Sequence, residues 1–296
     1  MQLRVFAAVG MTLAFVVQHI LDVLRVIWLP ILLQVIAYPP LMPGFLSAWA
    51  TVGTDPDAAM SHLAPVIAPA LLFIVIFVGA TVMMSCGLTR LILRGEKPAL
   101  PFLMRWGMEE WRVLGAWLMT VAIFLALEIG FIVVGRIIAS IMALGPGPGV
   151  ILGFVSLIVV ACLAVWIGIR LSLLVPATIA MGRIAPRTSW ETSEGNFWNM
   201  VGFWLIFAGT ALVVQLVSLG FLTPPGYFEA IGSGIGSQEE MRAAMRKAAE
   251  IMAKSYDLSD SGNLTRWLTG YALSTLGVTI TTIAGAVAWR QLTDKS

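Results

Sequence analysis

The sequence predicts an all-α fold, a polytopic membrane bundle of about six transmembrane helices, and two observations carry that prediction. Charged residues make up 11% of the 296 residues and hydrophobic residues 59%, whereas ordinary soluble domains are roughly 25% charged. A soluble globule must cover its surface with polar groups, and this chain has too few of them. The apolar residues also form six long runs. Each run can supply the about 20 helical residues that cross a bilayer, and backbone groups in lipid must bond within their own helix.

The six runs define the predicted spans. They are 26–54, 58–89, 113–135, 137–169, 195–228 and 267–289. Pro39, Pro40 and Pro43 should bend or end the first helix. That helix therefore either continues through a bend to about Ala50, or starts earlier, near Thr12. We favour an interfacial amphipathic helix over roughly residues 6–24 that leads into a kinked span.

The charges between the spans predict the orientation. The second and fourth connections are basic, with Arg90, Arg94, Lys97, Arg105 and Arg112 in one and Arg170, Arg183 and Arg187 in the other. The first connection has only Asp55 and Asp57 as charged residues. Short basic loops stay in the cytoplasm, so both termini are expected there. The fifth connection also contains basic residues, but it is long, and the short loops carry more weight.

The long connection over residues 223–265 is predicted to hold an amphipathic helix outside the cytoplasm. Ser237 and Glu240 have the spacing of a capping box, which places the start of a helix at about residue 238. Methionines follow on one face and charged residues on another, which favours a helix lying on the membrane or capping the bundle.

An internal repeat is the most informative pattern in the chain. Trp111, Gly115 and Trp117 recur 87 residues later as Trp198, Gly202 and Trp204, and Gly95 and Gly182 share the same offset. This predicts two duplicated helix pairs, 66–135 and 150–222, within a single membrane domain of 296 residues. The alternative is chance, because tryptophan and glycine are common at membrane interfaces and helix contacts.

The second copy also resembles a known family. Arg170-Leu-Ser-Leu-Leu-Val-Pro176, followed by Trp198 and Gly202, is similar to the signature of YciC-like bacterial inner-membrane proteins. These are related to the membrane domain of some glycerophosphodiester phosphodiesterases. The resemblance implies a six-helix protein of the bacterial cytoplasmic membrane without catalytic residues of its own. It marks Arg170, Pro176, Trp198 and Gly202 as candidate functional residues.

Glu128 is a further candidate, because it is the one charge inside the third apolar run. An ionisable residue within a span is costly and suggests a function, here a proton or cation site. The alternative is structural: Glu128 reaches the interface or pairs with Arg136 or Arg266.

The basic second connection is a candidate site for anionic lipid headgroups. It combines positive charge with tryptophan, and the residues concerned are Arg90, Arg94, Lys97, Arg105, Arg112 and Trp111. The same charges are also what the orientation of the chain requires.

No enzyme signature is present in the sequence. The two histidines are far apart, Cys86 and Cys162 lie in different apolar runs, and no hydrolase, nucleotide-binding or metal-ligand spacing occurs. We therefore predict a non-enzymatic inner-membrane protein with an envelope- or lipid-associated accessory role and no cofactor. Its expected partners are membrane lipids and a membrane or envelope protein, and not nucleic acid. The alternative is a small transporter with a site where the duplicated pairs meet.

Overall fold

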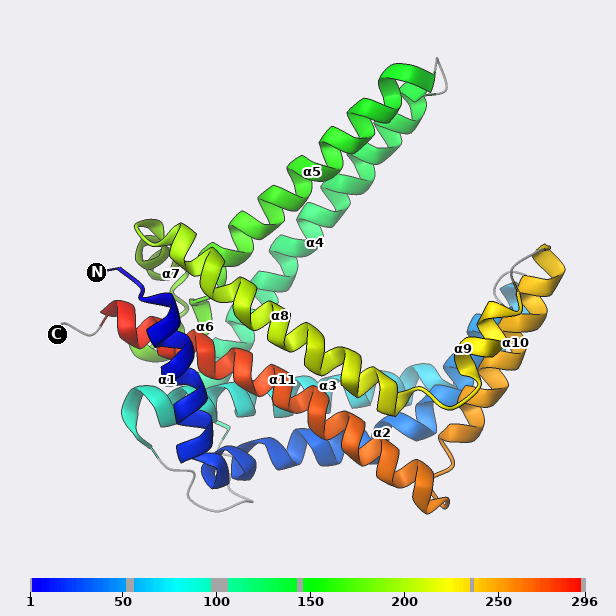
Figure 1. Cartoon of the computed structure of the whole chain (residues 1–296), viewed down its shortest axis with the longest axis horizontal. Helices are drawn as coiled ribbons and strands as arrows, with labels where there is room; N and C mark the ends of the chain where they lie inside the picture. Colours follow the sequence, from blue (N-terminus) through cyan, green and yellow to red (C-terminus); the bar gives the residue numbers. More distant parts are fainter. Residues whose placement is uncertain (1, 52–55, 97–105, 143–145, 235–236, 294–296) are drawn as a thin grey trace. The chain divides into compact units, whose positions relative to one another are not determined.

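The computed structural model describes residues 2–51, 56–96, 106–142, 146–234 and 237–293, and every regular element in these ranges is an α-helix (Figure 1). The helices are α1 (Val5–Gln18), α2 (Ile20–Thr51), α3 (Pro56–Arg94), α4 (Met108–Met142), α5 (Pro146–Leu171), α6 (Leu174–Met181), α7 (Pro186–Glu194), α8 (Phe197–Leu222), α9 (Tyr227–Gly232), α10 (Gln238–Ser255) and α11 (Ser261–Thr293).

Six helices in the described part of the chain are long and apolar enough to cross a membrane. They supply the candidate spans Ile20–Leu46, Met60–Arg94, Met108–Ile137, Ile151–Met181, Phe197–Leu222 and Ser261–Thr293. The chain is a multi-pass membrane protein, and the predicted all-helical class is confirmed.

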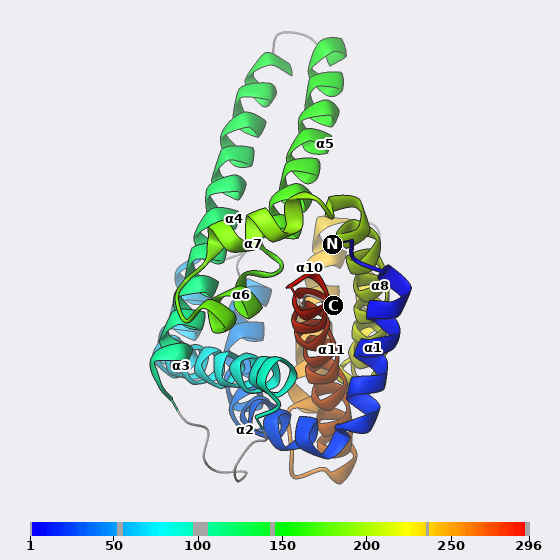
Figure 2. The ribbon, with the colours of Figure 1, turned by 90° about the vertical axis from the view of Figure 1, so that its left-hand side faces the viewer.

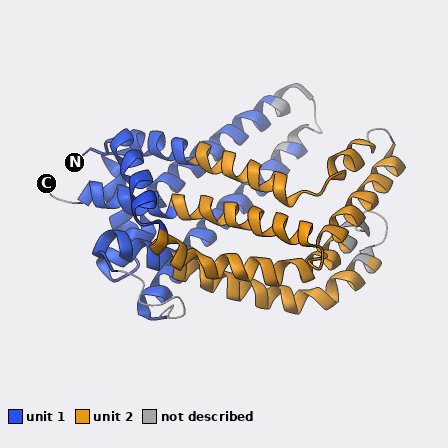
Figure 3. Cartoon of the chain, turned by 60° about the horizontal axis from the view of Figure 1, so that its bottom comes forward, with its two compact units in different colours: residues 1–20, 85–207, 282–296 blue, residues 21–84, 208–281 orange. Residues whose placement is uncertain are grey.

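The chain forms two compact units (Figure 3). Unit 1 comprises Met1–Ile20, Ser85–Phe207 and Thr282–Ser296, and unit 2 comprises Leu21–Met84 and Ala208–Thr281. Unit 1 therefore contains α1 and α4 to α7 complete, whereas α9 and α10 belong to unit 2. Helices α3, α8 and α11 contribute one part to each.

The first span follows the alternative in which the helix passes through its prolines. Helix α1 ends at Gln18, and α2 continues from Ile20 to Thr51 with four prolines inside it. The predicted interfacial segment was thus wrong at its end, because the break lies at His19 and not near Leu24. Each proline removes one backbone hydrogen bond of the helix. In a membrane protein, groups of neighbouring helices can satisfy the carbonyls that are left free. At Gly44 a neighbour comes close, since a Cβ atom there would lie 2.6 Å from Cγ1 of Val66 on α3.

The fourth predicted span is displaced along the sequence. Helix α4 continues to Met142 and α5 begins at Pro146, so residues 137–142 belong to α4, the helix of the third span, and not to α5. Proline at the first turn of α5 leaves no intrahelical bond broken. The two helices lie side by side (Figures 1 and 2). After α5, the chain forms the short helices α6 and α7, which the sequence analysis did not predict.

Unit 2 contains a continuous series of aromatic contacts. The ring of Tyr256 stacks on Trp267 at 4.6 Å between centroids, and Trp267 stacks on Tyr271 at 5.3 Å. Tyr38 of α2 then contacts Tyr271 at 5.7 Å and Phe73 of α3 at 6.0 Å. Burial is the largest of the effects that raise the pKa of Tyr256, and the neighbouring side chains of Tyr38 and Tyr227 raise it further. All four tyrosines of the chain lie in unit 2.

Helix α10 begins as predicted and packs against α9. The hydroxyl of Ser237 accepts a bond from the Glu240 backbone N–H, and the Glu240 carboxylate accepts one from the Ser237 backbone N–H. Ala244 and Ala248 form its buried face. At its end, the Trp267 indole N–H donates to the Ser255 carbonyl at 2.7 Å, which joins α10 to α11.

Candidate functional site

The two predicted repeat copies share a backbone feature at the ends of α3 and α6. Gly95 follows α3 with φ of 66°, and Gly182 follows α6 with φ of 62°. A side chain is strained at such φ values, so both positions favour glycine. Burial also agrees, because the paired residues Ala116 and Phe203 are both buried. The duplication of the two helix pairs stays a prediction.

The shared glycines of the tryptophan motif differ between the two copies. A Cβ atom at Gly115 would lie 2.8 Å from Cδ1 of Ile184, whereas one at Gly202 would meet nothing within 4 Å. Trp111 and Trp198 are both exposed. Gly115 therefore permits close packing of α4 on the segment after α6, whereas no described residue packs closely on Gly202.

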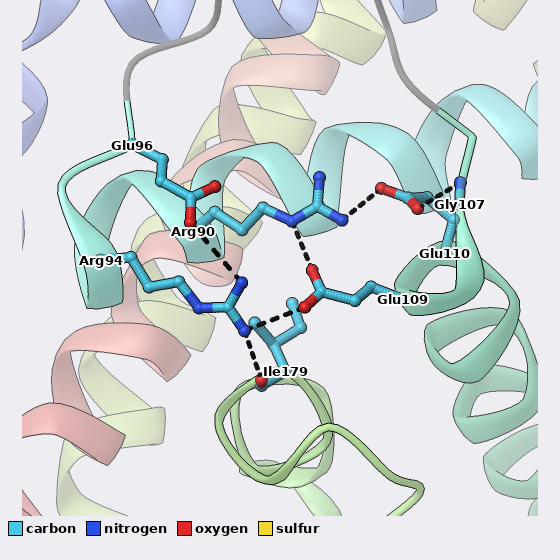
Figure 4. Close-up of polar contacts among 7 residues, drawn as sticks. All are labelled: Arg90, Arg94, Glu96, Gly107, Glu109, Glu110 and Ile179. Atoms are coloured by element: carbon cyan, nitrogen blue, oxygen red, sulfur yellow. Dashed lines mark hydrogen bonds and ion pairs between the residues drawn. The ribbon is translucent and has the colours of Figure 1, made fainter.

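The start of α4 is held to α3 by a group of ion pairs (Figure 4). Nε of Arg90 donates to Oε2 of Glu109, and Nη2 of Arg90 donates to Oε1 of Glu110, both at 2.6 Å. Glu110 is 2% exposed, and its Oε2 accepts the Gly107 backbone N–H at 2.7 Å. Arg94 donates through Nη2 to Oε1 of Glu109 at 2.9 Å. One buried carboxylate thus both caps α4 and binds α3.

The same group reaches α6 and has its own counter-charges. Nη2 of Arg94 also donates to the Ile179 carbonyl at 2.9 Å, and Nη1 lies 3.6 Å from the Glu96 carboxylate. Among the described residues, two arginines therefore face three carboxylates. A lipid phosphate would have to displace these carboxylates to bind Arg90 or Arg94. Lys97 and Arg105, also predicted to bind headgroups, lie outside the described residues.

Arg170 is balanced differently. It is 9% exposed, and its guanidinium carbon lies 5.3 Å from the ring centroid of Trp190, 5.7 Å from that of Phe197 and 5.8 Å from that of Trp166. Nη1 donates to the Trp190 carbonyl at 3.3 Å. Nε is buried without a hydrogen-bond partner, and no carboxylate pairs with this side chain within the described ranges. Aromatic faces stabilise the cation here.

The backbone of Arg170 holds α7 to α5, and its side chain contacts rings from three helices. The hydroxyl of Ser189, which is fully buried on α7, donates to the Arg170 carbonyl at 2.7 Å. Trp166 belongs to α5, Trp190 to α7 and Phe197 begins α8. Arg170 was a candidate from the sequence, but its aromatic surroundings were not predicted. The i,i+4 spacing of Trp166 and Arg170 indicated one of the three contacts.

The other candidate residues do not join this group. Pro176 is buried within α6, and Trp198 is 79% exposed on α8. Glu128 is exposed on α4 and makes no ion pair in the part of the chain that the structure describes. Its predicted partner Arg266 donates instead to the Phe221 carbonyl at 3.2 Å.

Two arginines without a carboxylate partner in the described residues lie where α4 meets the segment after α6. Nη1 of Arg112 lies against Gly182, at 3.6 Å from where a Cβ atom would be. Arg183 is the next residue and is exposed. Five exposed apolar side chains lie on or next to these two segments, namely Trp106, Met108, Trp111, Met181 and Ile184. We call this set of seven residues the basic patch.

A cavity of about 490 Å³ lies in unit 1 between α4 and α7. Its apolar lining consists of Met119, Ile123, Leu171, Pro186 and Trp190, and its charged lining of Arg187, Glu191 and Glu194. We call it the α7 pocket. Trp190 separates it from Arg170, since its ring lines the pocket and also contacts the guanidinium.

Comparison with known proteins found no matching family model, no matching curated protein and no matching solved structure. The similarity to YciC-like proteins over Arg170–Gly202 therefore remains a prediction.

Proposed function

We propose that the protein is a non-enzymatic, lipid-associated accessory protein of a bacterial inner membrane, and that the basic patch binds anionic lipid headgroups. The observation that carries the proposal is the presence of two arginines, Arg112 and Arg183, without carboxylate partners in the described residues beside exposed tryptophans. Arginine binds phosphate through paired N–H groups. Tryptophan favours the headgroup layer.

The orientation predicted from the charge pattern agrees with this role. The basic patch lies in the two connections that the charge pattern assigns to the cytoplasm, where the leaflet surface is negative. Arg90 and Arg94 hold α3, α4 and α6 together, so they build the support for the patch and leave headgroup binding to Arg112 and Arg183.

The test compares lipid retention by the purified full chain. Native mass spectrometry would count phosphatidylglycerol and phosphatidylcholine molecules retained by the wild type and by the double variant Arg112→Gln/Arg183→Gln. Each basic residue near an anionic surface contributes about 1 kcal/mol, so the preference for phosphatidylglycerol should fall about 30-fold. The variant Arg246→Gln/Lys247→Gln is the matched control, since it removes two exposed basic residues of α10. An unchanged preference in the first variant would refute the proposal.

Buried hydroxyl groups favour a second candidate function, that of a small transporter. Ser85 and Thr89 lie one turn apart on α3, and both hydroxyls are buried with no hydrogen-bond partner among the residues that the structure describes. Thr81, one turn earlier, instead donates to the Phe77 carbonyl at 2.8 Å, as helix hydroxyls in membranes commonly do. Polar groups that face the interior of a membrane protein often mark a solute or proton path.

Proton flux distinguishes this candidate from the accessory role. Proteoliposomes containing a pH-sensitive dye would be exposed to an imposed pH gradient, with the wild type compared with Glu128→Gln and Ser85→Ala/Thr89→Ala. Flux above that of empty vesicles, lost in either variant, would support a proton-coupled transporter. Flux equal to that of empty vesicles would reject proton transport.

A further inference from the structure

The α7 pocket has a charge pattern that differs from that of the basic patch. Arg187, Trp190, Glu191 and Glu194 follow the i, i+3, i+4, i+7 spacing, so they occupy one face of α7. From Arg187 to Glu194 this face extends about 10.5 Å. That length and the volume of the pocket suit the headgroup of a single phospholipid.

The charges on this face leave one carboxylate unbalanced. Nε of Arg187 donates to Oε1 of Glu191 at 2.7 Å, and this bond raises the pKa of Arg187. Glu194 is exposed and has no partner in the described part of the chain. It is also the last residue of α7, and the C-terminal end of a helix carries negative potential. The pocket is therefore positive at one end and negative at the other, with a net negative charge.

The apolar lining shows where the rest of the molecule would lie. Met119 and Ile123 come from the third span, Leu171 is the last residue of α5, and Trp190 lies in the middle of α7. A water-soluble ligand would gain little from this surface, whereas the glycerol and upper acyl carbons of a lipid would be buried against it. The occupant should thus combine a phosphate, an amine and an apolar body.

We propose that the α7 pocket binds one glycerophospholipid with a primary-amine headgroup, of the phosphoethanolamine type. The phosphate lies at Arg187, and the ammonium group donates hydrogen bonds to Glu194 and Glu191. An anionic headgroup is repelled by the unbalanced carboxylate. A fully methylated headgroup keeps its charge but cannot donate the hydrogen bonds. The proposal is independent of anionic-lipid binding at the basic patch, because it depends on other residues and the opposite charge.

The experiment measures lipid retention by the full chain with a headgroup series. Native mass spectrometry would compare phosphatidylethanolamine, its N,N-dimethyl form and phosphatidylcholine, which have the same net charge and differ in their N–H groups. Charge-assisted hydrogen bonds should make the primary amine bind about tenfold more tightly than the trimethyl form. Glu194→Gln should remove most of this preference, and Glu250→Gln, which neutralises an exposed carboxylate of α10, should keep it.

Two further arms keep the result decisive. Ile123→Trp should fill the apolar end of the α7 pocket and reduce retention of all three lipids. This variant tests the pocket if Glu194→Gln folds poorly. Glycerophosphoethanolamine, which lacks acyl chains, should not displace the lipid at equal concentration. Equal retention of the three lipids by the wild type, a preference that survives Glu194→Gln, or displacement by the soluble headgroup would overturn the proposal. Arg112→Gln/Arg183→Gln should leave the amine preference unchanged, so the two proposals fail separately.

Discussion

Arg90 and Arg170 lie in the same unit and are both largely shielded, yet their charges are balanced in different ways. Arg90 has two carboxylate partners, one of which is 2% exposed. Arg170 has three aromatic rings and no carboxylate partner in the described residues. An ion pair makes each partner depend on the other, because removing one leaves a buried charge. An aromatic cage creates no such dependence, so the two arginines should respond differently to the same substitution.

The largest effect is expected from Arg90→Met. The substitution leaves the Glu110 carboxylate buried without its cation and frees one contact of Glu109. Loss of one member of a buried pair costs about 3 kcal/mol or more. Thermal unfolding of the purified protein in detergent would measure it.

The double variant Arg90→Met/Glu110→Gln is the control for this prediction. It removes the orphaned charge and should recover about half of the lost stability, since a neutral amide is easier to bury than a carboxylate. A double variant less stable than Arg90→Met alone would show that Glu110 acts mainly by capping α4.

A smaller effect is expected from Arg170→Met. No carboxylate is left unpaired, and the loss comprises cation–π contacts and one bond to a carbonyl, together about 2 kcal/mol. Arg170→Lys should restore little, because a compact ammonium does not stack on three rings as a planar guanidinium does. The same unfolding assay tests the comparison, and a loss as large as that of Arg90→Met would contradict it.

The smallest effect is expected from Ser189→Ala. This change removes one buried hydrogen bond to the Arg170 carbonyl and should lower the free energy of unfolding by about 1 kcal/mol. Ser61→Ala is the matched control, because its hydroxyl also donates to a carbonyl but is exposed. Equal losses in the two variants would mean that Ser189 does not help to hold α7 on α5.

The spans were predictable from sequence because charge is excluded from lipid whatever the tertiary packing. The start of α10 was also predictable, because the Ser237–Glu240 capping box is a local interaction that depends only on sequence spacing. The apolar pattern misplaced the start of the fourth span, because residues 137–142 are apolar in either helix and only the chain reversal decides between them. It also missed α6 and α7, whose sequences are short and lack a clear apolar period.

The candidate site was only partly predictable. Arg170 was marked by the resemblance to a family, but its cage depends on Trp190 and Phe197, which approach it only once α7 and α8 have folded. Arg90 was predicted to face lipid headgroups because the sequence does not show that Glu109 and Glu110 return to it. Sequence spacing gives the residues on one helix face, and tertiary structure determines which charges are already balanced.

The placement of every tyrosine in unit 2 makes the chain suitable for selective fluorine labelling. Fluorotyrosine incorporated during expression would place ¹⁹F nuclei at Tyr38, Tyr227, Tyr256 and Tyr271, and at no position of unit 1. Four resonances would then report on one unit alone. Titrating a lipid that binds at α7 while watching those lines would reveal whether occupancy in one half of the protein is sensed by the other.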